Sequence, residues 1–559
     1  MNDDYKGLYA AIILSALVVL GVNYFFPKPV KPVPTTAAEE VVITPETVAE
    51  NQIAAEETTA EETPPSAQEV LAQDSRLPVK NEVVAGTIRL KGARFDNLDL
   101  LKYKETIEEG SPNVSLLVPA KTIDAYFADY GWLTTDPNIK VPDAETLWTA
   151  VGNAELTPST PITLEWNNGQ GIKFINQISV DEHYLFTVKQ KIENNSGKTV
   201  TLLPYGLFSK HIDEAAQSRS VVHEGFVGVL DGKLKEIRYN KMKNEPLELE
   251  TTGGWISFAD KYWFGSFIFN DSAKTKINLR KVKDGLYQLD YKGEPMQINS
   301  GASSEVTTQL YAGAKEIKLL DKYAKSIKKF DLNIDFGWYY FLTKPFFYVL
   351  DFLYGLIGNM GWAILLFAAI LRLSMFPLAH KSYDNMSKMK KVQPKLMALQ
   401  ELYKDDKMAL QRATMELYKK EKVNPAAGCL PMFIQIPIFF SLFKVLNIAI
   451  EIRHAPFIGW VKDLSAPDPL TISTWAHIYV PSVIDIGVWP LIYGATMFLQ
   501  NQLNPKPANK DQARMFALMP ILFTIMFAHF AVGLVIYWTL NNILSLIQQK
   551  IIMNKNGVK

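Results

Sequence analysis

The chain has 559 residues, with 58 Lys and Arg against 58 Asp and Glu and a formal net charge of zero. No basic excess or motif indicates direct nucleic-acid binding, and the single cysteine, Cys429, excludes intramolecular disulfides and cysteine-ligated metal sites. The length predicts several domains, and the composition excludes a disordered, collagen-like or disulfide-rich protein.

The first apolar run extends from Leu8 to Phe26 and carries no charge. Its 19 residues are enough for a helix to cross a hydrocarbon core. A cleaved signal peptide is the alternative, but the preceding MNDDYK is not basic and no clear cleavage site precedes Pro27. We therefore expect residues 1–26 to form a transmembrane anchor.

The next segment, residues 27–80, is acidic and rich in proline. It holds eight Pro, ten Asp or Glu and only four Lys or Arg, so it can bury too little apolar surface to offset the entropy of ordering the chain. We expect a disordered tether.

Residues 81–335 alternate β-branched and aromatic residues with polar turns, as in His183–Glu193 and Lys198–Phe208 on either side of Asn-Asn-Ser-Gly. This pattern predicts an antiparallel β-sandwich and lacks the βαβ rhythm of nucleotide-binding folds. A rival reading makes the domain an enzyme that uses His183, His211 or His223 in acid–base roles. No acid–His spacing supports it, and we expect no enzyme.

Residues 336–358 are strongly aromatic but include Lys344, Pro345 and Asp351. Tyr and Trp favour the membrane–water interface, so we expect an amphipathic helix lying on the bilayer rather than a span. The alternative is an edge of the soluble core.

Five more apolar runs follow, and with the anchor they predict a polytopic α-helical membrane protein with six transmembrane helices. We assign the second span to residues 359–380, four further spans to 426–552 and a cytoplasmic tail to 553–559. The last two runs are separated only by a Val-Gly turn. The runs are Gly361–Ala379, Ala426–Asn447, Ile486–Gln500, Met515–Ala531 and Leu534–Gln549.

Charge predicts the orientation of these spans. Lys381–Asn424 carries eleven Lys or Arg against six acids, whereas Ile448–Asp485 carries two bases against four acids. Short loops rich in Lys and Arg stay in the cytoplasm. Both termini are therefore expected in the cytoplasm, with the β domain and its tether outside.

The basic segment, residues 381–425, predicts a cytoplasmic hairpin of two antiparallel helices, divided at Asp405-Asp406, with Pro394 interrupting the first helix. Five methionines in it suit contacts with partners. For most of them, packing of one helix on the other is the alternative that we favour. They are Met386, Met389, Met397, Met408 and Met415.

Arg372 lies inside the second span, seven residues from the cytoplasmic end, which corresponds to about 10 Å along a helix. Such a charge costs about 2.5–3.5 kcal/mol on insertion scales. The membrane portions of the five C-terminal runs contain no Asp or Glu, and Arg cannot lose its proton. The charge must therefore snorkel to the headgroups or lie in a watery recess open to the cytoplasm.

Other polar residues in the spans favour the recess, which would bind a polar or acidic segment entering the membrane: Gln435, Ser441, Thr539, Asn541 and Asn542. The lack of membrane carboxylates weighs against an ion-coupled transporter, and no P-loop is present. A channel or small-solute transporter stays as the alternative function.

Three long stretches of the C-terminal half resemble the YidC-type membrane protein insertases: AILLFAAILRLSMFP, VQPKLMALQELYKDDKMALQRATMELYKKEKVNPAAGCLPMFIQIPIFFSLF and VGLVIYWTLNNILSLIQQ. The block GTIRLKGARFDNLDLLKYKETI resembles the start of the family's periplasmic β-supersandwich, which is typical of Gram-negative members. The resemblance implies an inner-membrane insertase and chaperone for nascent membrane proteins, with a five-helix core around a hydrophilic groove open to the cytoplasm and lipid.

The family's groove arginine, which attracts the hydrophilic tail of the nascent protein, falls on Arg372. The resemblance also implies that the protein inserts its clients alone or together with the Sec translocon. It implies that the hairpin contacts the ribosome and the signal-recognition targeting machinery, and that the protein contacts membrane lipids. It implies no cofactor or metal. The expected substrate-binding residues are Arg372, Gln435, Ile436, Pro437, Leu522, Met526, Tyr537, Trp538 and Asn541.

The sequence departs from the family pattern at two places. Some relatives have Thr where Ala368 stands, and a Tyr often found in the last span is replaced by Trp538, beside Tyr537. The groove's polarity is then expected to come from other groups. Lys444 corresponds to no known role.

Overall fold

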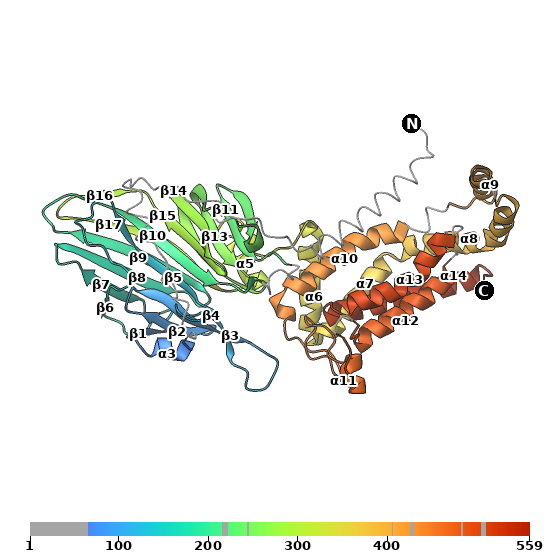
Figure 1. Cartoon of the computed structure of the whole chain (residues 1–559), viewed down its shortest axis with the longest axis horizontal. Coiled ribbons are helices and arrows are strands. Elements are labelled where there is room, and N and C mark those ends of the chain that lie inside the picture. The colour runs from blue at the N-terminus through green and yellow to red at the C-terminus, as the bar shows by residue number, and fades with distance from the viewer. Residues whose placement is uncertain are drawn as a thin grey trace. The chain divides into compact units, whose positions relative to one another are not determined.

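The computed structural model describes residues 65–214, 222–242, 245–404, 406–424, 430–481, 484–504 and 510–558. It contains two compact units (Figure 1). The first holds the described residues up to 105 and Pro112–Asn333, and the second holds Thr106–Ser111 and the described residues from Ile334 onward. The expected anchor and most of the tether lie outside the described residues.

The first unit is built from one continuous antiparallel sheet with seventeen strands among its described residues. The strands are β1 (Arg76–Lys80), β2 (Val84–Arg89), β3 (Arg94–Lys104), β4 (Asn113–Leu117), β5 (Tyr126–Thr134), β6 (Thr149–Val151), β7 (Ile162–Asn167), β8 (Ile172–Val180), β9 (Leu185–Asn194), β10 (Val200–His211), β11 (Gly225–Leu230), β12 (Lys233–Arg238), β13 (Leu247–Ala259), β14 (Trp263–Lys283), β15 (Leu286–Lys292), β16 (Met296–Ile298) and β17 (Ala302–Ala314). Short helices accompany them: α3 (Ala67–Leu71), η2 (Tyr239–Lys241), α5 (Ile317–Tyr323) and η3 (Phe330–Asn333).

The sheet folds over itself because the hairpin β13–β14 passes from one layer into the other. The first part of β14 pairs with β17, and its second part pairs with β15. The register shifts between Thr252 and Gly254, where Gly254 has a φ of +94° and a Cβ would lie 2.0 Å from the carbonyl oxygen of Val229. Glycine therefore permits the change of layer.

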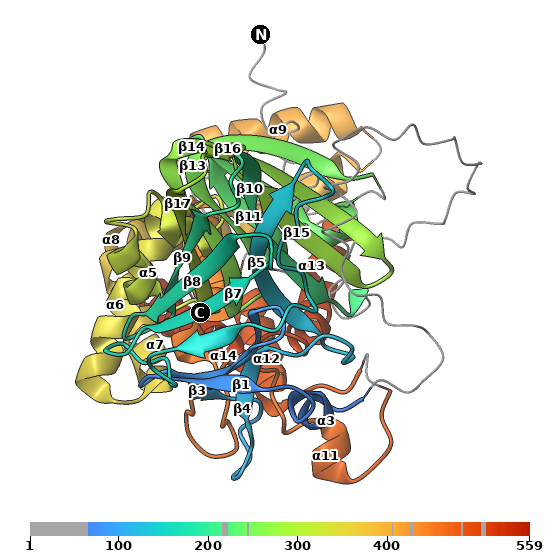
Figure 2. The ribbon, with the colours of Figure 1, turned by 90° about the vertical axis from the view of Figure 1, so that its left-hand side faces the viewer.

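Aromatic rings from the two layers meet in the core and confirm the expected β-sandwich. Tyr130 of β5 contacts Phe267 of β14, with ring centroids 5.5 Å apart. Phe95 of β3 contacts Phe186 of β9 at 5.7 Å. In one layer, β7, β8 and β9 lie side by side, as Figure 2 shows.

The sheet begins earlier than the sequence predicted, since β1 lies inside the expected tether. Leu77 and Val79 of β1 are buried, and Arg76 forms an ion pair with the buried Asp96. The average composition of residues 27–80 concealed this short alternating strand, so the boundary at residue 81 was wrong. Ser66 also caps α3 by accepting a hydrogen bond from the amide of Glu69.

The second unit is helical. Its helices are α6 (Tyr340–Ile357), α7 (Met360–Ser374), α8 (Phe376–Leu402), α9 (Lys407–Lys420), α10 (Leu430–Ile448), η5 (Ile450–Ile452), α11 (Ile472–Ala476), α12 (Val488–Leu503), α13 (Lys510–Phe527) and α14 (Val532–Lys555). Each predicted apolar run of this region therefore lies mainly on a helix. Asp406 caps α9, which confirms the division of the hairpin there.

The second predicted span, residues 359–380, does not lie on a single helix. α7 stops at Ser374, and α8 starts at Phe376 after a bend of 66°. Pro377 lies in the first turn of α8, a position where its missing amide hydrogen costs nothing. Pro394, expected to interrupt the first hairpin helix, lies within a continuous α8 instead.

No single helix among the described residues is both long and apolar enough to qualify as a membrane span. Only the bent pair α7–α8 reaches the required length and composition, when its two helices are taken together. The count of six spans stays a prediction.

One loop, residues 453–468, binds the N-terminal ends of three helices. The carbonyl groups of Ala466 and Leu464 accept hydrogen bonds from the first two amides of α14, those of Val532 and Gly533. Val532 and Gly533 are thus helical, and the predicted Val-Gly turn falls at residues 528–531 instead.

The same loop reaches α12 and α7. Asp468 accepts a hydrogen bond from the amide of Trp489 at 2.7 Å. Phe457 packs on Gly361 of α7 so closely that a Cβ there would lie 2.0 Å from the ring. Backbone groups that a helix end leaves unpaired are satisfied in this way, and the three helix ends are held together.

Lys444, whose role the sequence left open, has a partner before α6. Its Nζ lies 2.5 Å from Oδ2 of Asp335, and both side chains are largely buried. Asp335 also accepts a hydrogen bond from the amide of Gly337, which has a φ of +73° and packs on the Lys444 side chain. The ion pair ties α10 to the segment that leads into α6.

Replacing Lys444 with Met should lower the free energy of unfolding by about 1–2 kcal/mol, because the largely buried ion pair between Lys444 and Asp335 is lost. Thermal unfolding of the purified protein in detergent measures this. Lys462→Met, at an exposed position, is the control, and Asp335→Asn added to Lys444→Met should regain part of the loss. An unchanged melting temperature for Lys444→Met would contradict the assignment.

Candidate functional site

Arg372 lies in the last turn of α7 and is half-buried. Its Nη2 donates a hydrogen bond of 2.8 Å to the hydroxyl of Tyr383, and its guanidinium lies 5.9 Å from the centre of that ring. Its Nε is buried and has no hydrogen-bond partner among the described residues. The cation is therefore held by a neutral phenol, with donors left over.

Gln435 and Tyr537 form a second polar contact, between α10 and α14. Nε2 of Gln435 donates to the hydroxyl of Tyr537 at 3.4 Å, and Tyr537 is buried. Asn541, one turn further along α14, is also buried. The structure thus places three of the expected residues on or against α14, which contacts α7, α8, α10 and α12.

Trp538 faces a different way from Tyr537 because neighbouring residues on a helix point about 100° apart. Its ring packs against Phe439 at 5.1 Å, Phe527 at 6.0 Å and Tyr493 at 6.2 Å. Met526 packs against the same aromatic cluster. Trp538 therefore contributes packing, although its indole Nε1 has no hydrogen-bond partner in the described part of the chain.

The polar face of α14 is longer than the sequence reasoning recognised. It continues from Asn541 and Asn542 through Ser545 to Gln548 and Gln549, all of them buried. These residues recur at intervals of three or four and so lie on one face of the helix. This spacing is the sequence signal that could have revealed the full polar face.

This face is only partly satisfied by the protein. Asn542 donates to Thr496 at 3.4 Å, and Gln549 donates to Asn504 at 3.2 Å. Both polar atoms of the Gln548 side chain, and Oγ of the buried Ser441 on α10, have no partner among the described residues. Buried polar atoms of this kind are usually satisfied by water or a ligand.

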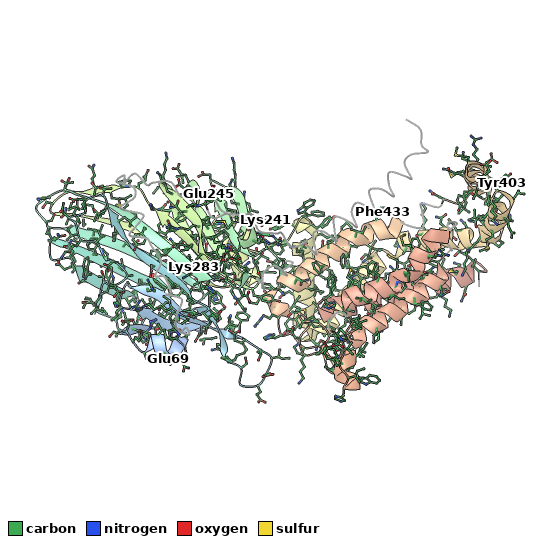
Figure 3. All side chains as sticks on the ribbon, viewed as in Figure 1. Glu69, Lys241, Glu245, Lys283, Tyr403 and Phe433 are labelled. Atoms are coloured by element: carbon green, nitrogen blue, oxygen red, sulfur yellow. The ribbon has the colours of Figure 1, made fainter. Side chains whose placement is uncertain are left out.

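The expected lipid-side contact line is only partly exposed. Leu522 on α13 is 63% exposed, whereas Ile436, Pro437 and Met526 are half-buried. Six other exposed apolar side chains on the same two helices were missed, since an unbroken apolar run does not show which face points outward. They are Phe433, labelled in Figure 3, with Ile434, Met515, Phe516, Leu518 and Ile521.

The hairpin methionines divide into two groups. Met386 packs against Ala379, Tyr383 and Ile552, where α8 meets α14. Three others are exposed, by 53% for Met397, 64% for Met408 and 50% for Met415. The favoured alternative, that most of the five pack one hairpin helix on the other, is therefore wrong for these three.

Ala368, one turn before Arg372, is buried and offers no polar group. The hydroxyl that some relatives were expected to carry there is thus not replaced at that position. The expectation that other groups supply the polarity of the groove stays a prediction.

The family comparisons cover nearly the whole described chain. A family model described as the YidC periplasmic domain matches residues 76–349, and one described as the 60Kd inner membrane protein matches residues 352–558. A protein of Sinorhizobium fredii is 43% identical over 573 residues, covering 100% of this chain and 97% of its own. One of Rickettsia bellii is 42% identical, covering 98% and 99%. Both are named membrane protein insertase YidC.

Two solved structures match this chain with low sequence identity and low TM-scores. An active YidC insertase with its first transmembrane domain resolved is 18% identical with a TM-score of 0.36, covering 97% of this chain and 98% of its own. A galactose mutarotase-like protein from Lactobacillus casei is 8% identical with a TM-score of 0.29, covering 43% and 100%. The family assignment therefore rests on the sequence matches.

The packing of Trp538 predicts a stability effect. Trp538→Ala should lower the free energy of unfolding by about 3 kcal/mol, because it empties the aromatic cluster. Trp538→Tyr should cost much less. Melting temperatures in detergent test this, with Trp475→Ala as the control, since Trp475 is 73% exposed. Equal melting temperatures for Trp538→Ala and the parent would show that Trp538 is not a packing residue.

Proposed function

The chain belongs to the YidC family of membrane protein insertases, and from this premise we propose that it inserts nascent inner-membrane proteins through a hydrophilic groove containing Arg372 and open to the cytoplasm. One observation carries the proposal. A guanidinium that is half-buried among apolar helices has a neutral hydrogen-bond partner and a buried Nε to which no described residue bonds.

The groove lowers the cost of moving a polar tail into the membrane. Water and Arg372 replace part of the tail's hydration, and attraction between opposite charges is several times stronger at reduced dielectric than in bulk water. The partly satisfied face of α14, with Gln548 and Asn541, supplies further groups for water or the tail. No covalent step or nucleotide is needed.

The driving force comes from the client itself. Burial of its apolar segment in lipid is favourable by about 25 cal/mol per Å². The membrane potential adds about 2.3 kcal/mol per charge per 100 mV, which favours outward movement of acidic tails in a cell that is negative inside. The client's apolar segment leaves along α10 and α13, past Ile436, Pro437, Leu522 and Met526.

The proposed topology follows from the charge pattern. Both termini and the hairpin α8–α9 lie in the cytoplasm, the sheet unit lies in the periplasm, and six helices span the inner membrane. α6 lies at the interface, and the exposure of Phe341, Phe352 and Leu356, at 72%, 63% and 68%, supports this.

The proposed partners follow from this topology. The exposed methionines of the hairpin suit contacts with the ribosome and the targeting machinery. The protein works alone or with the Sec translocon. The names of the curated relatives favour this function over a channel or small-solute transporter.

Arg372→Ala should slow the insertion of clients with acidic tails about tenfold or more, because the tail loses its charge partner in a region of reduced dielectric. Arg372→Lys should retain much of the activity, since the charge remains. Insertion into proteoliposomes by the purified protein, without the Sec translocon, measures the rates. Arg514→Ala, at an exposed position, is the control. Native rates with both Arg372 variants would refute the groove-charge proposal.

A hydrated groove should also be chemically accessible. Cys429 is the only cysteine, so Cys429→Ser provides a background for single-cysteine labelling. Ser545→Cys, although largely buried, should react with a membrane-impermeant maleimide added from the cytoplasmic side, because groove water reaches it. Ala363→Cys on α7, buried among side chains, should not react. Failure of Ser545→Cys to react, with correct folding, would indicate a dry, packed interior.

A further inference from the structure

Tyr383 is the residue that holds Arg372, and it comes from the first helix of the hairpin. It lies on α8, eleven residues after Arg372 and beyond the 66° bend. Its ring is 7% exposed and packs with Ala379, Ile552 and Met386. Since the ring cannot rotate freely there, the position of its hydroxyl is set by α8 and α14.

The residues next to Tyr383 attach α8 to the end of α14. Asp384 accepts a hydrogen bond of 2.9 Å from Nδ2 of Asn556 and forms an ion pair of 2.9 Å with Lys388. Oγ of Ser387 donates to the carbonyl oxygen of Tyr383 at 2.8 Å. The hydroxyl that reaches Arg372 therefore belongs to a well-anchored turn of helix.

The connection between α7 and α8 is short. Met375 alone separates the two helices, with Arg372 three residues before it and Tyr383 eight residues after it. A change in the angle between the helices moves the phenol relative to the guanidinium. A hydrogen bond of 2.8 Å is lost once its heavy atoms separate by more than about 3.5 Å, so a shift below 1 Å is enough.

A phenol is suited to hold this cation without cancelling its charge. A carboxylate in the same place would neutralise Arg372 and compete with an acidic client tail for its donors. Tyr383 accepts one hydrogen bond through a neutral oxygen, and the guanidinium keeps its full charge. Nε, which is buried and has no partner among the described residues, remains for a ligand.

We propose that Tyr383 is a positioning residue that fixes the direction of the Arg372 guanidinium. Because Tyr383 lies on the first helix of the hairpin, the orientation of the hairpin then controls how the groove presents the charge of Arg372 to a client. The proposal rests on the proposed function, since it concerns the same charge. It adds a physical link between the cytoplasmic hairpin and the interior of the helical unit.

The test is a double-mutant cycle on Tyr383 and Arg372, read out as insertion rates into proteoliposomes. Tyr383→Phe keeps the packed ring and removes only the hydrogen-bond acceptor. It should slow clients with acidic tails by about tenfold, the lower end of what a lost hydrogen bond to a charged group costs. Clients with neutral tails should be inserted at the native rate, which also shows that the variant folds.

In the Arg372→Ala background, Tyr383→Phe should have no further effect, because the residue that it positions is gone. Tyr479→Phe is the matched control, since Tyr479 is 93% exposed in the loop that contains α11. If Tyr383→Phe slows all clients equally, or if its effect multiplies with that of Arg372→Ala, Tyr383 is structural and the positioning role is refuted. If Arg372→Ala alone leaves acidic clients unaffected, the proposed function itself fails.

Discussion

The central constraint on the helical unit is the positive charge of Arg372, which lies among apolar helices. Arg372 cannot be neutralised by losing a proton, and the helices α7, α10, α12 and α14 contain no Asp or Glu. A neutral phenol from across a helix bend satisfies one of its donors and leaves its charge intact. The chain thus keeps a positive charge in a poorly solvated place, which is costly for stability and is the feature on which the proposed function rests.

The central helix α14 carries both residues that pack in the apolar core and residues that form polar contacts. Trp538 packs into the aromatic cluster, while Tyr537 turns to Gln435 of α10. Further along, the polar face from Asn541 to Gln549 is buried, and the described part of the chain satisfies only some of its polar atoms. A helix that served only as structural core would avoid such residues, because each unpaired amide weakens the fold. Retaining them is consistent with a surface built to be wetted or to bind a client.

Sequence patterns predicted the sheet and the helices well, because alternation and apolar runs are local signals. They failed where a few residues differ from their surroundings: β1 is a short alternating strand inside an acidic segment, and the apolar run Gly361–Ala379 is broken at Met375, before a new helix begins. The contact between Arg372 and Tyr383 was not predictable, since eleven residues and a 66° bend separate them. Nor could the apolar runs show that Trp538 packs into an aromatic cluster with Phe439 and Phe527.

The two ends of the helical unit are held by different kinds of bond, and this difference favours opening on one side. The loop 453–468 fixes the starts of α7, α12 and α14 through backbone carbonyls, the carboxylate of Asp468 and the close contact at Gly361. At the other end, α8 is attached to α14 through side chains, such as Asp384 to Asn556. Backbone bonds at tightly packed glycines allow little movement, whereas half-exposed polar side chains can exchange their partners for water at small cost. The more adjustable end lies beside the hairpin and Arg372, which is the side from which the proposed function has a client enter.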